Sequence, residues 1–327
     1  MEKKELPEME CLRSQVSSLY DEVLDYRSPQ CFGRMMNLVV RNSQMSVLNA
    51  YLVLFQMPNA YIVMSPYRWR NLCHRQPKKG ARPIATFFPF GPVEFLYEVG
   101  DTEPIPEMEN RPAYEGGSRE FMPSADDMER IEHYANPFSF NGDKAVVDVL
   151  LERVARSLPF HGIALDFNVR AGSCTGGYIC VESKPIDISV PNGWDRRDSR
   201  FVIHINRNAD DSAQLSSICH ELGHFFCRHL TFDYAKDQCR DNLTKRQCEF
   251  EAETVAAIVL ERYGLKTPSA EYLHAYIDEN GLLPEVNIDV ISSAVSKIQA
   301  TLNGEVTCKT GDLYRNDADF AAFIDSI

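Results

Sequence analysis

Apolar residues recur every three or four positions in several stretches of this chain, a period that predicts amphipathic helices. In the first third of the chain, this period predicts three helices and a helical turn that begins at a proline: Met9–Tyr26, Cys31–Val40, Met45–Gln56 and Pro66–Cys73. Shorter β-rich runs predict one strand and one hairpin: Asn59–Met64, Pro83–Phe88 and Val93–Val99. We therefore expect helices and a small sheet in this part of the chain.

The pattern changes twice in the remainder of the chain. Two helices are predicted first: Ala125–Tyr134 and Lys144–Leu158. Runs rich in β-branched residues then predict four strands: Ala164–Val169, Gly177–Glu182, Ile186–Val190 and Phe201–Asn206. The helical period returns in the last predicted elements: Leu215–Leu230, Gln247–Tyr263, Ser269–Glu279 and Ile288–Leu302. Helices, then a sheet, then helices again predict an α+β fold class.

Prolines and glycines interrupt the pattern between residues 101 and 124. Four prolines and the pair Gly116–Gly117 lie there among several acidic residues, which is typical of a linker or a long loop. We therefore predict three parts: a small helical and β domain at 1–103, a linker at 104–124 and a second domain at 125–327.

Charge is distributed unevenly between these parts. The chain of 327 residues holds 34 Lys+Arg and 47 Asp+Glu, so its net charge is −13. That total argues against a protein that coats nucleic acid over its whole surface. Residues 27–93, however, hold nine Lys or Arg and no Asp or Glu. The N-terminal part is therefore a candidate for a local basic surface.

Cysteine usage and hydropathy indicate where the protein resides. Ten cysteines in 327 residues are too sparse for a disulfide scaffold, and the lack of a C-x-x-C pair argues against a cysteine-rich zinc site. No apolar run approaches the ~18 residues of a transmembrane helix, and the first residues are too polar for a signal peptide. We expect a cytoplasmic protein with reduced thiols and no membrane partner.

The clearest chemical signal is an H-E-x-x-H motif formed by His220, Glu221 and His224. Residues four apart share one face of a helix, so both imidazoles can reach one metal ion. Glu221 can then act as a general base beside that ion. On a helical wheel, small residues surround the histidines and apolar residues occupy the opposite side. Such a helix leaves room for a metal and a substrate.

A catalytic zinc needs a third protein ligand. The spacing of His229 does not fit H-E-x-x-H-x-x-G-x-x-H, and this histidine is expected to be exposed or to cap a helix. In the next predicted helix, Glu251 lies on the apolar arc, whereas Glu249 and Glu253 lie on the polar side. A buried carboxylate without a partner is costly, and metal ligation would resolve that cost. The alternative is a buried salt bridge to an arginine.

Together with Glu251-Ala252-x-x-x-Ala256, the motif resembles the ImmA/IrrE family of zinc metallopeptidases over roughly residues 125–305. This resemblance implies a zincin-like fold of the gluzincin type, with Glu221 as the catalytic base and a peptide or protein as the substrate. It also implies one Zn²⁺ per chain with three protein ligands: His220, His224 and Glu251.

A zincin-like domain places a sheet beside the active-site helix, and an edge strand can then hold an extended peptide. Three residues of the predicted sheet region could approach the metal site and stabilise the transition state: Tyr178, His204 and Arg207. The alternative is that these side chains have structural roles.

The N-terminal part resembles the single-stranded-DNA-binding domain of ArdC-type antirestriction proteins. The resemblance rests on short motifs in a fixed order: Ser46-Val47-Leu48-Asn49-Ala50, Gln56-Met57-Pro58-Asn59-Ala60, Trp69 with Leu72, and Lys78-Lys79-Gly80. ArdC-type proteins join such a domain to an ImmA/IrrE-like metallopeptidase in this order. Single-stranded DNA is therefore an expected partner of the N-terminal part.

Aromatic residues are interleaved with the basic residues of the same region. Proteins that bind single strands combine a positive groove with aromatic side chains on which bases stack. The residues expected to contact nucleic acid are Arg68, Trp69, Arg70, Lys78 and Lys79. The alternative is that the aromatic residues fill a small core and the basic residues form a solvated face.

These observations lead to one principal hypothesis and one alternative. We expect a zinc-dependent metallo-endopeptidase with a single-stranded-DNA-binding module, acting in antirestriction or in the cleavage of a regulator. The alternative is a non-proteolytic protein that protects single-stranded DNA and carries a structural or regulatory zinc.

Overall fold

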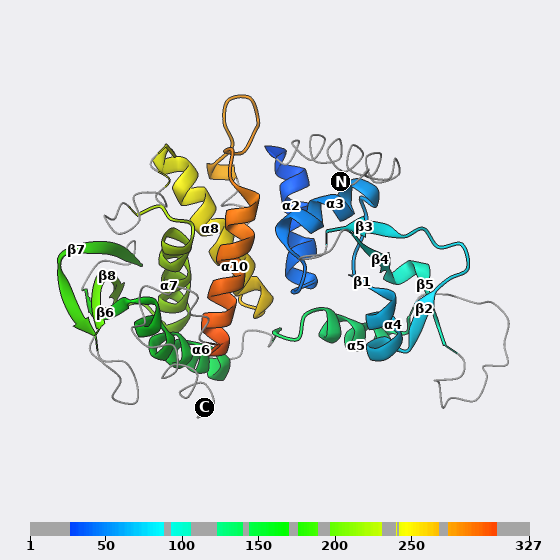
Figure 1. The fold of residues 1–327 in the computed structure, drawn as a ribbon, viewed down its shortest axis with the longest axis horizontal. Coiled ribbons are helices and arrows are strands. Elements are labelled where there is room, and N and C mark those ends of the chain that lie inside the picture. Colours follow the sequence, from blue (N-terminus) through cyan, green and yellow to red (C-terminus); the bar gives the residue numbers. More distant parts are fainter. Residues whose placement is uncertain are drawn as a thin grey trace, which may run out of the picture. The chain divides into compact units, whose positions relative to one another are not determined.

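The protein is described by a computed structural model with a mixed α+β fold, as the sequence predicts (Figure 1). The described residues are 27–87, 93–105, 123–139, 144–169, 176–188, 197–230, 240, 242–267 and 274–305. They form two compact units, which lie within Met1–Ser139 plus Pro268–Glu285 and within Phe140–Thr267 plus Val286–Ile327. The helix predicted at Met9–Tyr26 and most of the predicted linker lie outside the described residues.

The first unit combines helices with short antiparallel strands. Its helices are α2 (Pro29–Arg41), α3 (Val47–Gln56), α4 (Pro66–Cys73) and α5 (Ala125–Ala135). Its strands are β1 (Val63–Met64), β2 (Arg75–Pro77), β3 (Ile84–Thr86), β4 (Glu94–Glu98) and β5 (Thr102–Pro104). The sheet order is β1-β4-β3, with a separate pair β2-β5, and all these pairs are antiparallel. The predicted hairpin, formed by β3 and β4, is confirmed.

Serine caps explain where three of these helices begin. Ser46, Ser65 and Ser124 each accept a hydrogen bond from the backbone N–H three residues further along. This contact satisfies one of the N–H groups that the first turn of a helix leaves unpaired. Proline in the first turn of α2 and α4 reinforces the start, because its fixed φ suits that position.

Trp69 lies in the core of the first unit. Its side chain is 0% exposed, and its Nε1–H donates a hydrogen bond of 2.8 Å to the carbonyl oxygen of Tyr97. Ile131 and Ala135 of α5 pack in the same apolar cluster. This packing explains why the first unit continues to residue 139, whereas the sequence pattern places α5 beyond the linker in the second domain.

The second unit contains a three-stranded sheet with helices packed against it. Its helices are α6 (Lys144–Ser157), the short η3 (Leu158–His161), α7 (Asp211–Phe226), α8 (Lys245–Arg262) and α10 (Ile288–Asn303). Its strands are β6 (Ile163–Val169), β7 (Gly177–Ile188) and β8 (Arg197–Asn206). In the order β6-β8-β7, the central β8 runs parallel to β6 and antiparallel to β7.

Two sequence-based assignments in the C-terminal half differ from the structure. The two strands expected between residues 177 and 190 are one strand, β7, whose register shifts between Val181 and Ile186. Such a shift interrupts the alternation of side chains, which explains why the pattern looks like two strands. The helix predicted at Ser269–Glu279 lies partly outside the described residues, and within them only His274 and Ala275 are helical.

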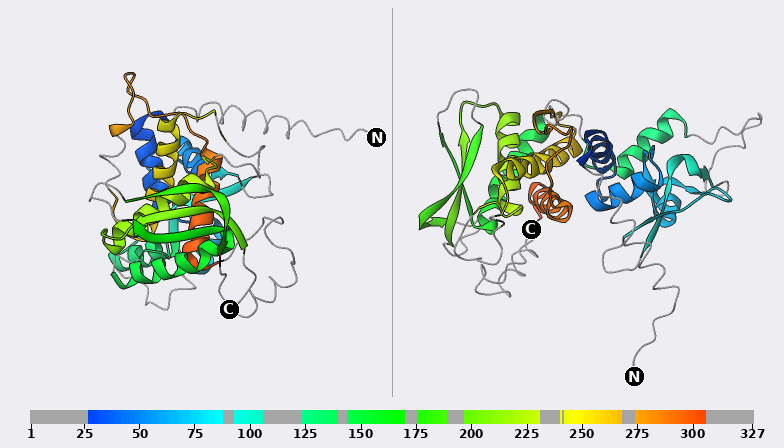
Figure 2. Two further views of the ribbon diagram at one scale, coloured as in Figure 1. Left: turned by 90° about the vertical axis from the view of Figure 1, so that its left-hand side faces the viewer. Right: turned by 90° about the horizontal axis from the view of Figure 1, so that it is seen from above.

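Helix α7 occupies the middle of the second unit, between the sheet and the other helices (Figures 1 and 2). It contacts β7 and β8 as well as α8 and α10. Asp210 caps α7, and Thr244 with Gln247 forms a capping box at the start of α8. The H-E-x-x-H helix is therefore packed directly against the helix that carries the three candidate glutamates. Among the described residues, no helix has the length and apolar character needed to cross a bilayer.

Candidate metal centre

The structure brings the two predicted histidines together on one face of α7. The Nε2 atoms of His220 and His224 lie 3.1 Å apart. Their side chains are partly covered, with exposed fractions of 23% and 13%. Four residues span slightly more than one helical turn, so the two rings converge on one point.

Glu249 of α8 completes this group. Its Oε2 lies 3.4 Å from Nε2 of His220 and 3.6 Å from Nε2 of His224. The three donor atoms all lie within 4.8 Å of one another. Two imidazoles and one carboxylate are a donor set that a catalytic zinc uses while it keeps a position open for water. The arrangement is therefore compatible with a metal ion.

The structure does not place Glu251 with these histidines. Its carboxylate is 0% exposed, as its place on the apolar arc suggests, but it accepts two hydrogen bonds from Arg240, one of 2.8 Å from Nη2 to Oε1. The backbone N–H of Asn287 also donates to it over 2.9 Å. Glu251 is thus the carboxylate of a buried salt bridge, and Glu249 is the carboxylate that lies with the two histidines, so the ligand role of Glu251 stays a prediction. The guanidinium of Arg240 offsets the burial cost of the Glu251 carboxylate.

The second nitrogen of each candidate ligand ring also has a partner. Nδ1 of His220 lies 2.8 Å from Oε2 of Glu253, and Nδ1 of His224 lies 3.0 Å from Nδ1 of His229. Partners of this kind orient ligating imidazoles and fix which nitrogen faces the metal. The sequence does contain a signal for Glu253: it lies four residues after Glu249 on α8, and residues four apart share one face of a helix.

His229 connects the candidate centre to the buried salt bridge. Its side chain is only 2% exposed, and its Nε2 lies 2.9 Å from Oε2 of Glu251. The expectation that His229 is exposed is therefore wrong, whereas its backbone N–H does cap the end of α7 by donating to the carbonyl oxygen of His224 over 3.0 Å. The chain of contacts runs from Arg240 through Glu251 and His229 to the ring of His224, so the salt bridge helps to orient that ring.

The surrounding charges favour a bound cation. Although burial lowers the pKa of His220, hydrogen bonds with Glu249 and Glu253 raise it to about 10. The hydrogen bond from His220 lowers the pKa of Glu249 to about 2. Burial, together with the charges of His220 and His229, lowers the pKa of His224 to about 4. The carboxylates thus hold a positive charge on His220, and a metal cation can take the place of that proton.

Glu221 lies beside this group in a covered position. Its side chain is 7% exposed, and its Oε2 accepts a hydrogen bond of 2.8 Å from the backbone N–H of Ile179 in β7. Burial raises the pKa of the Glu221 carboxyl, although His220 and the Ile179 N–H act in the opposite direction. A carboxylate with a raised pKa next to a metal site is suited to accept a proton and return it.

The close approach of α7 and α8 depends on Gly223. A Cβ atom at this position would lie 2.7 Å from the carbonyl oxygen of Ala252 and 2.8 Å from its Cα. Both are backbone atoms of α8, so they cannot rotate out of the way. The absence of a side chain at Gly223 therefore sets the distance at which Glu249 meets the two histidines.

Gly223→Ala is expected to force the helices apart and to lower the free energy of unfolding by about 1–3 kcal/mol. It is also expected to weaken metal binding, because Glu249 moves with α8. Denaturant unfolding and metal titration measure the two effects. Ser216→Ala, at an exposed position of the same helix, is the matched control and should change neither. Unchanged stability of Gly223→Ala would contradict the close packing.

The residues predicted to contact nucleic acid fall into two groups. Trp69 is buried in the core, so its ring is not available for base stacking. Arg68 and Lys78 are half-buried, and each donates to a backbone carbonyl oxygen of its own unit. Arg70 and Lys79 are exposed. The alternative that aromatic residues fill the core applies to Trp69, and the two exposed cations remain candidates for phosphate contacts.

The sheet residues considered as transition-state stabilisers have other contacts. The rings of Tyr178 and His204 are stacked, with centroids 4.7 Å apart. Nδ1 of His204 lies 2.9 Å from Oδ2 of Asp166. Arg207 is exposed in the turn after β8. These contacts support the structural alternative for Tyr178, whereas His204 belongs to a separate group of donor atoms on the sheet.

Comparisons with known proteins give one match. The family model of the M78 peptidases, described as the IrrE N-terminal-like domain, matches residues 181–279. This span contains both helices of the candidate centre, but it does not include residues 27–139 of the first unit. No curated protein and no solved structure matches the chain. Residues 181–279 are therefore similar to a domain of a peptidase family.

Proposed function

We propose that the second unit is a zinc-dependent metallo-endopeptidase. The observation that carries this proposal is the convergence of three donor atoms: Nε2 of His220, Nε2 of His224 and Oε2 of Glu249. The match to the M78 peptidase model supports a peptide or protein as the substrate. When bound there, zinc would polarise the substrate carbonyl as a Lewis acid and lower the pKa of a water molecule.

The residues around this group have separable roles in peptide hydrolysis. Glu221 would accept a proton from the attacking water and return it to the leaving amine. The N–H of Ile179 holds the Glu221 carboxylate in place, and Glu253 and His229 orient the two imidazoles. Since β7 is at an edge of the described sheet, an extended peptide could pair with it beside Glu221.

Metal removal tests the proposal directly. The purified protein is expected to contain zinc and to hydrolyse a mixture of unstructured peptides. A chelator that removes the metal should abolish hydrolysis, and added zinc should restore it. The combined variant His220→Ala, His224→Ala should stay inactive after zinc is added, which shows that the restored activity depends on this site. Full hydrolysis by metal-free protein would refute the proposal.

A second proposed activity concerns single-stranded DNA, as an antirestriction protein would require. It is favoured by the absence of Asp and Glu from residues 27–93, which hold nine Lys or Arg. Arg70 and Lys79 are exposed within this stretch, and Tyr67 is 76% exposed one turn before Arg70 on α4. Because Trp69 is buried, Tyr67 is the better candidate for base stacking.

Salt dependence tests this second activity in the full-length protein. Binding to single strands should weaken linearly on a log–log plot against salt, with a slope of about −0.7 per phosphate contact. Arg70→Ala combined with Lys79→Ala should reduce the magnitude of that slope by about 1.4. Arg130→Ala, an exposed cation outside the basic stretch, should leave the slope unchanged. Salt-insensitive binding, or an equal loss in the control, would exclude a phosphate-driven contact.

A further inference from the structure

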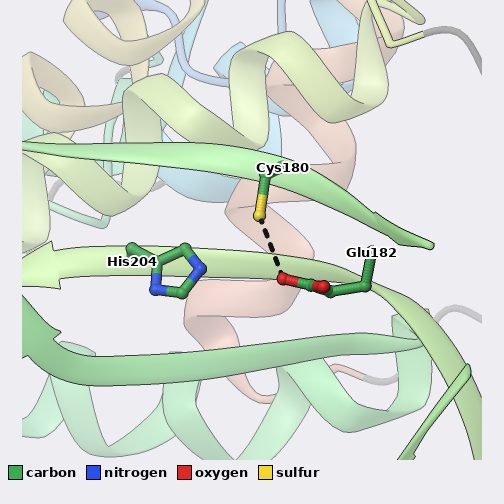
Figure 3. Close-up of side chains that lie close together, drawn as sticks. All are labelled: Cys180, Glu182 and His204. Atoms are coloured by element: carbon green, nitrogen blue, oxygen red, sulfur yellow. Dashed lines mark hydrogen bonds between the residues drawn. The ribbon is translucent and has the colours of Figure 1, made fainter. Parts of the chain in front are cut away.

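A second group of metal-type donors lies on the sheet of the second unit (Figure 3). It consists of Cys180 and Glu182 from β7 and His204 from β8, and it shares no residue with the candidate centre on α7 and α8. Its sulfur, oxygen and nitrogen donor atoms lie within 4.8 Å of one another. We propose that Cys180, Glu182 and His204 form a second, thiolate-containing site for a divalent transition metal, with zinc as its first candidate.

Strand register explains why the three donors converge. Cys180 and Glu182 are two residues apart on β7, so their side chains lie on the same side of the sheet. His204 on β8 is directly paired with Tyr178, which precedes Cys180 by two residues and belongs to that same side. Ile203, next to His204 in the strand, is fully buried on the opposite side. Cys180 and His204 are thus held by paired backbones, which position ligands more precisely than loops do, and Glu182 follows Val181, the last paired residue before the register shift.

His204 is already oriented for a metal. Its Nδ1 contacts Asp166 of β6 at 2.9 Å, and its ring stacks on Tyr178. With Nδ1 engaged, Nε2 is the nitrogen that is turned toward Cys180 and Glu182 (Figure 3). A carboxylate on the non-ligating nitrogen is the usual support of a metal-binding histidine. Asp166 therefore has the position of a partner that fixes the ligand.

The contact between Cys180 and Glu182 is the one that a cation would replace. The Sγ–H of Cys180 donates to Oε1 of Glu182 over 3.7 Å. As the donor in this contact, the thiol of Cys180 carries its proton in the metal-free protein. On binding, the S–H bond breaks, the proton passes to solvent and a metal–sulfur bond forms.

The donor types select the class of metal. Thiolate, imidazole and carboxylate together suit zinc and other borderline or soft transition metals. Calcium and magnesium prefer sites made of oxygen donors alone. This site differs from the candidate catalytic centre, where nitrogen and oxygen are the only donors. A sulfur-specific signal therefore distinguishes the sheet site from the candidate catalytic centre.

Another sulfur-containing group in the second unit must be distinguished from it. Cys227, His229 and Glu251 also have donor atoms close together. There, however, the guanidinium of Arg240 already binds both oxygens of Glu251 and supplies the positive charge. The described contacts of Cys180, Glu182 and His204 include no such cation. The sheet group is therefore the better cation site.

Cobalt titration of the metal-free, full-length protein tests the proposal. The wild type is expected to bind about two ions per chain and to develop a near-ultraviolet thiolate-to-cobalt charge-transfer band. Cys180→Ser should abolish this band and lower the stoichiometry by about one ion. Asp166→Asn should keep the band but weaken this site about 10- to 100-fold, because His204 loses its support. Zinc should displace the cobalt and remove the band.

Two controls separate this site from the catalytic one and from general damage. His220→Ala combined with His224→Ala should lower the stoichiometry by about one ion and keep the band, so failure of the proposed peptidase centre would not be mistaken for failure here. Cys31→Ser, which changes a half-buried thiol of α2, should leave the band unchanged. The proposal is overturned if the wild type shows no band at saturating cobalt. It is also overturned if the band persists in folded Cys180→Ser protein, whose unfolding midpoint provides the check on folding.

Discussion

Glu221→Gln is expected to remove most peptide hydrolysis while metal binding stays intact. Glutamine keeps the size of the side chain, and its amide oxygen can still accept the hydrogen bond from Ile179. It cannot accept the proton of the attacking water, and loss of a general acid–base group lowers the rate about 10²- to 10⁴-fold. The fall should appear in kcat, because the substituted group takes part in proton transfer and does not hold the metal.

Metal content and kcat must be measured on the same preparation of this variant. Glu152→Gln, the same substitution at an exposed position of α6, is the matched control and should leave both unchanged. If Glu221→Gln hydrolysed peptides at the wild-type rate with its metal bound, Glu221 would not be the base. If the variant lost its metal, the experiment would point to a ligand role for Glu221 that the structure does not suggest.

The second large effect distinguishes two glutamates that lie two residues apart on α8. Changing a residue that only supports a metal ligand weakens metal binding about 10- to 100-fold. Glu249→Gln removes a ligand atom, so it is expected to weaken zinc binding by more than that. The protein should remain folded, since Glu249 is partly exposed. Glu251→Gln, in contrast, leaves Arg240 without its charged partner, and breaking a buried pair costs about 3–5 kcal/mol of stability.

The two substitutions serve as controls for each other because they change the same chemical group on the same helix. Zinc affinity, measured by competition with a chelator, should fall more in Glu249→Gln. The free energy of unfolding, measured by denaturant titration, should fall more in Glu251→Gln. Combining Glu251→Gln with Arg240→Gln should cost less than the sum of the single changes, as expected of directly paired groups. If Glu251→Gln lost zinc as severely as Glu249→Gln without losing stability, the ligand set expected from the sequence would be restored.

Local features of the fold could be predicted from the sequence because their causes are local. Helix α4 begins at Pro66 after its serine cap, and the predicted bounds agree with the structure. The convergence of His220 and His224 follows from their spacing on a single helix. The hairpin of β3 and β4 follows from two β-rich runs separated by prolines and a glycine.

Features that depend on distant residues could not be predicted in the same way. The helical wheel identifies Glu251 as buried, but it does not reveal that Arg240, from the segment between α7 and α8, is its partner. The wheel also places Glu249 on the polar side of α8. This placement is correct, because Glu249 is partly exposed and faces the polar side chains of His220 and His224. Helix α5 was expected beyond the linker because composition does not show that Ile131 packs near Trp69.

The burial of Trp69 also provides an optical means to study the first unit. The chain holds two tryptophans, and the other, Trp194, lies outside the described residues. Changing Trp194 to phenylalanine would leave one indole, whose emission shifts to longer wavelength when water reaches it. The full-length protein would then carry its one indole inside the first unit. Emission recorded during denaturant unfolding, with and without zinc, would show whether metal loading of one unit alters the unfolding of the other, without any attached dye.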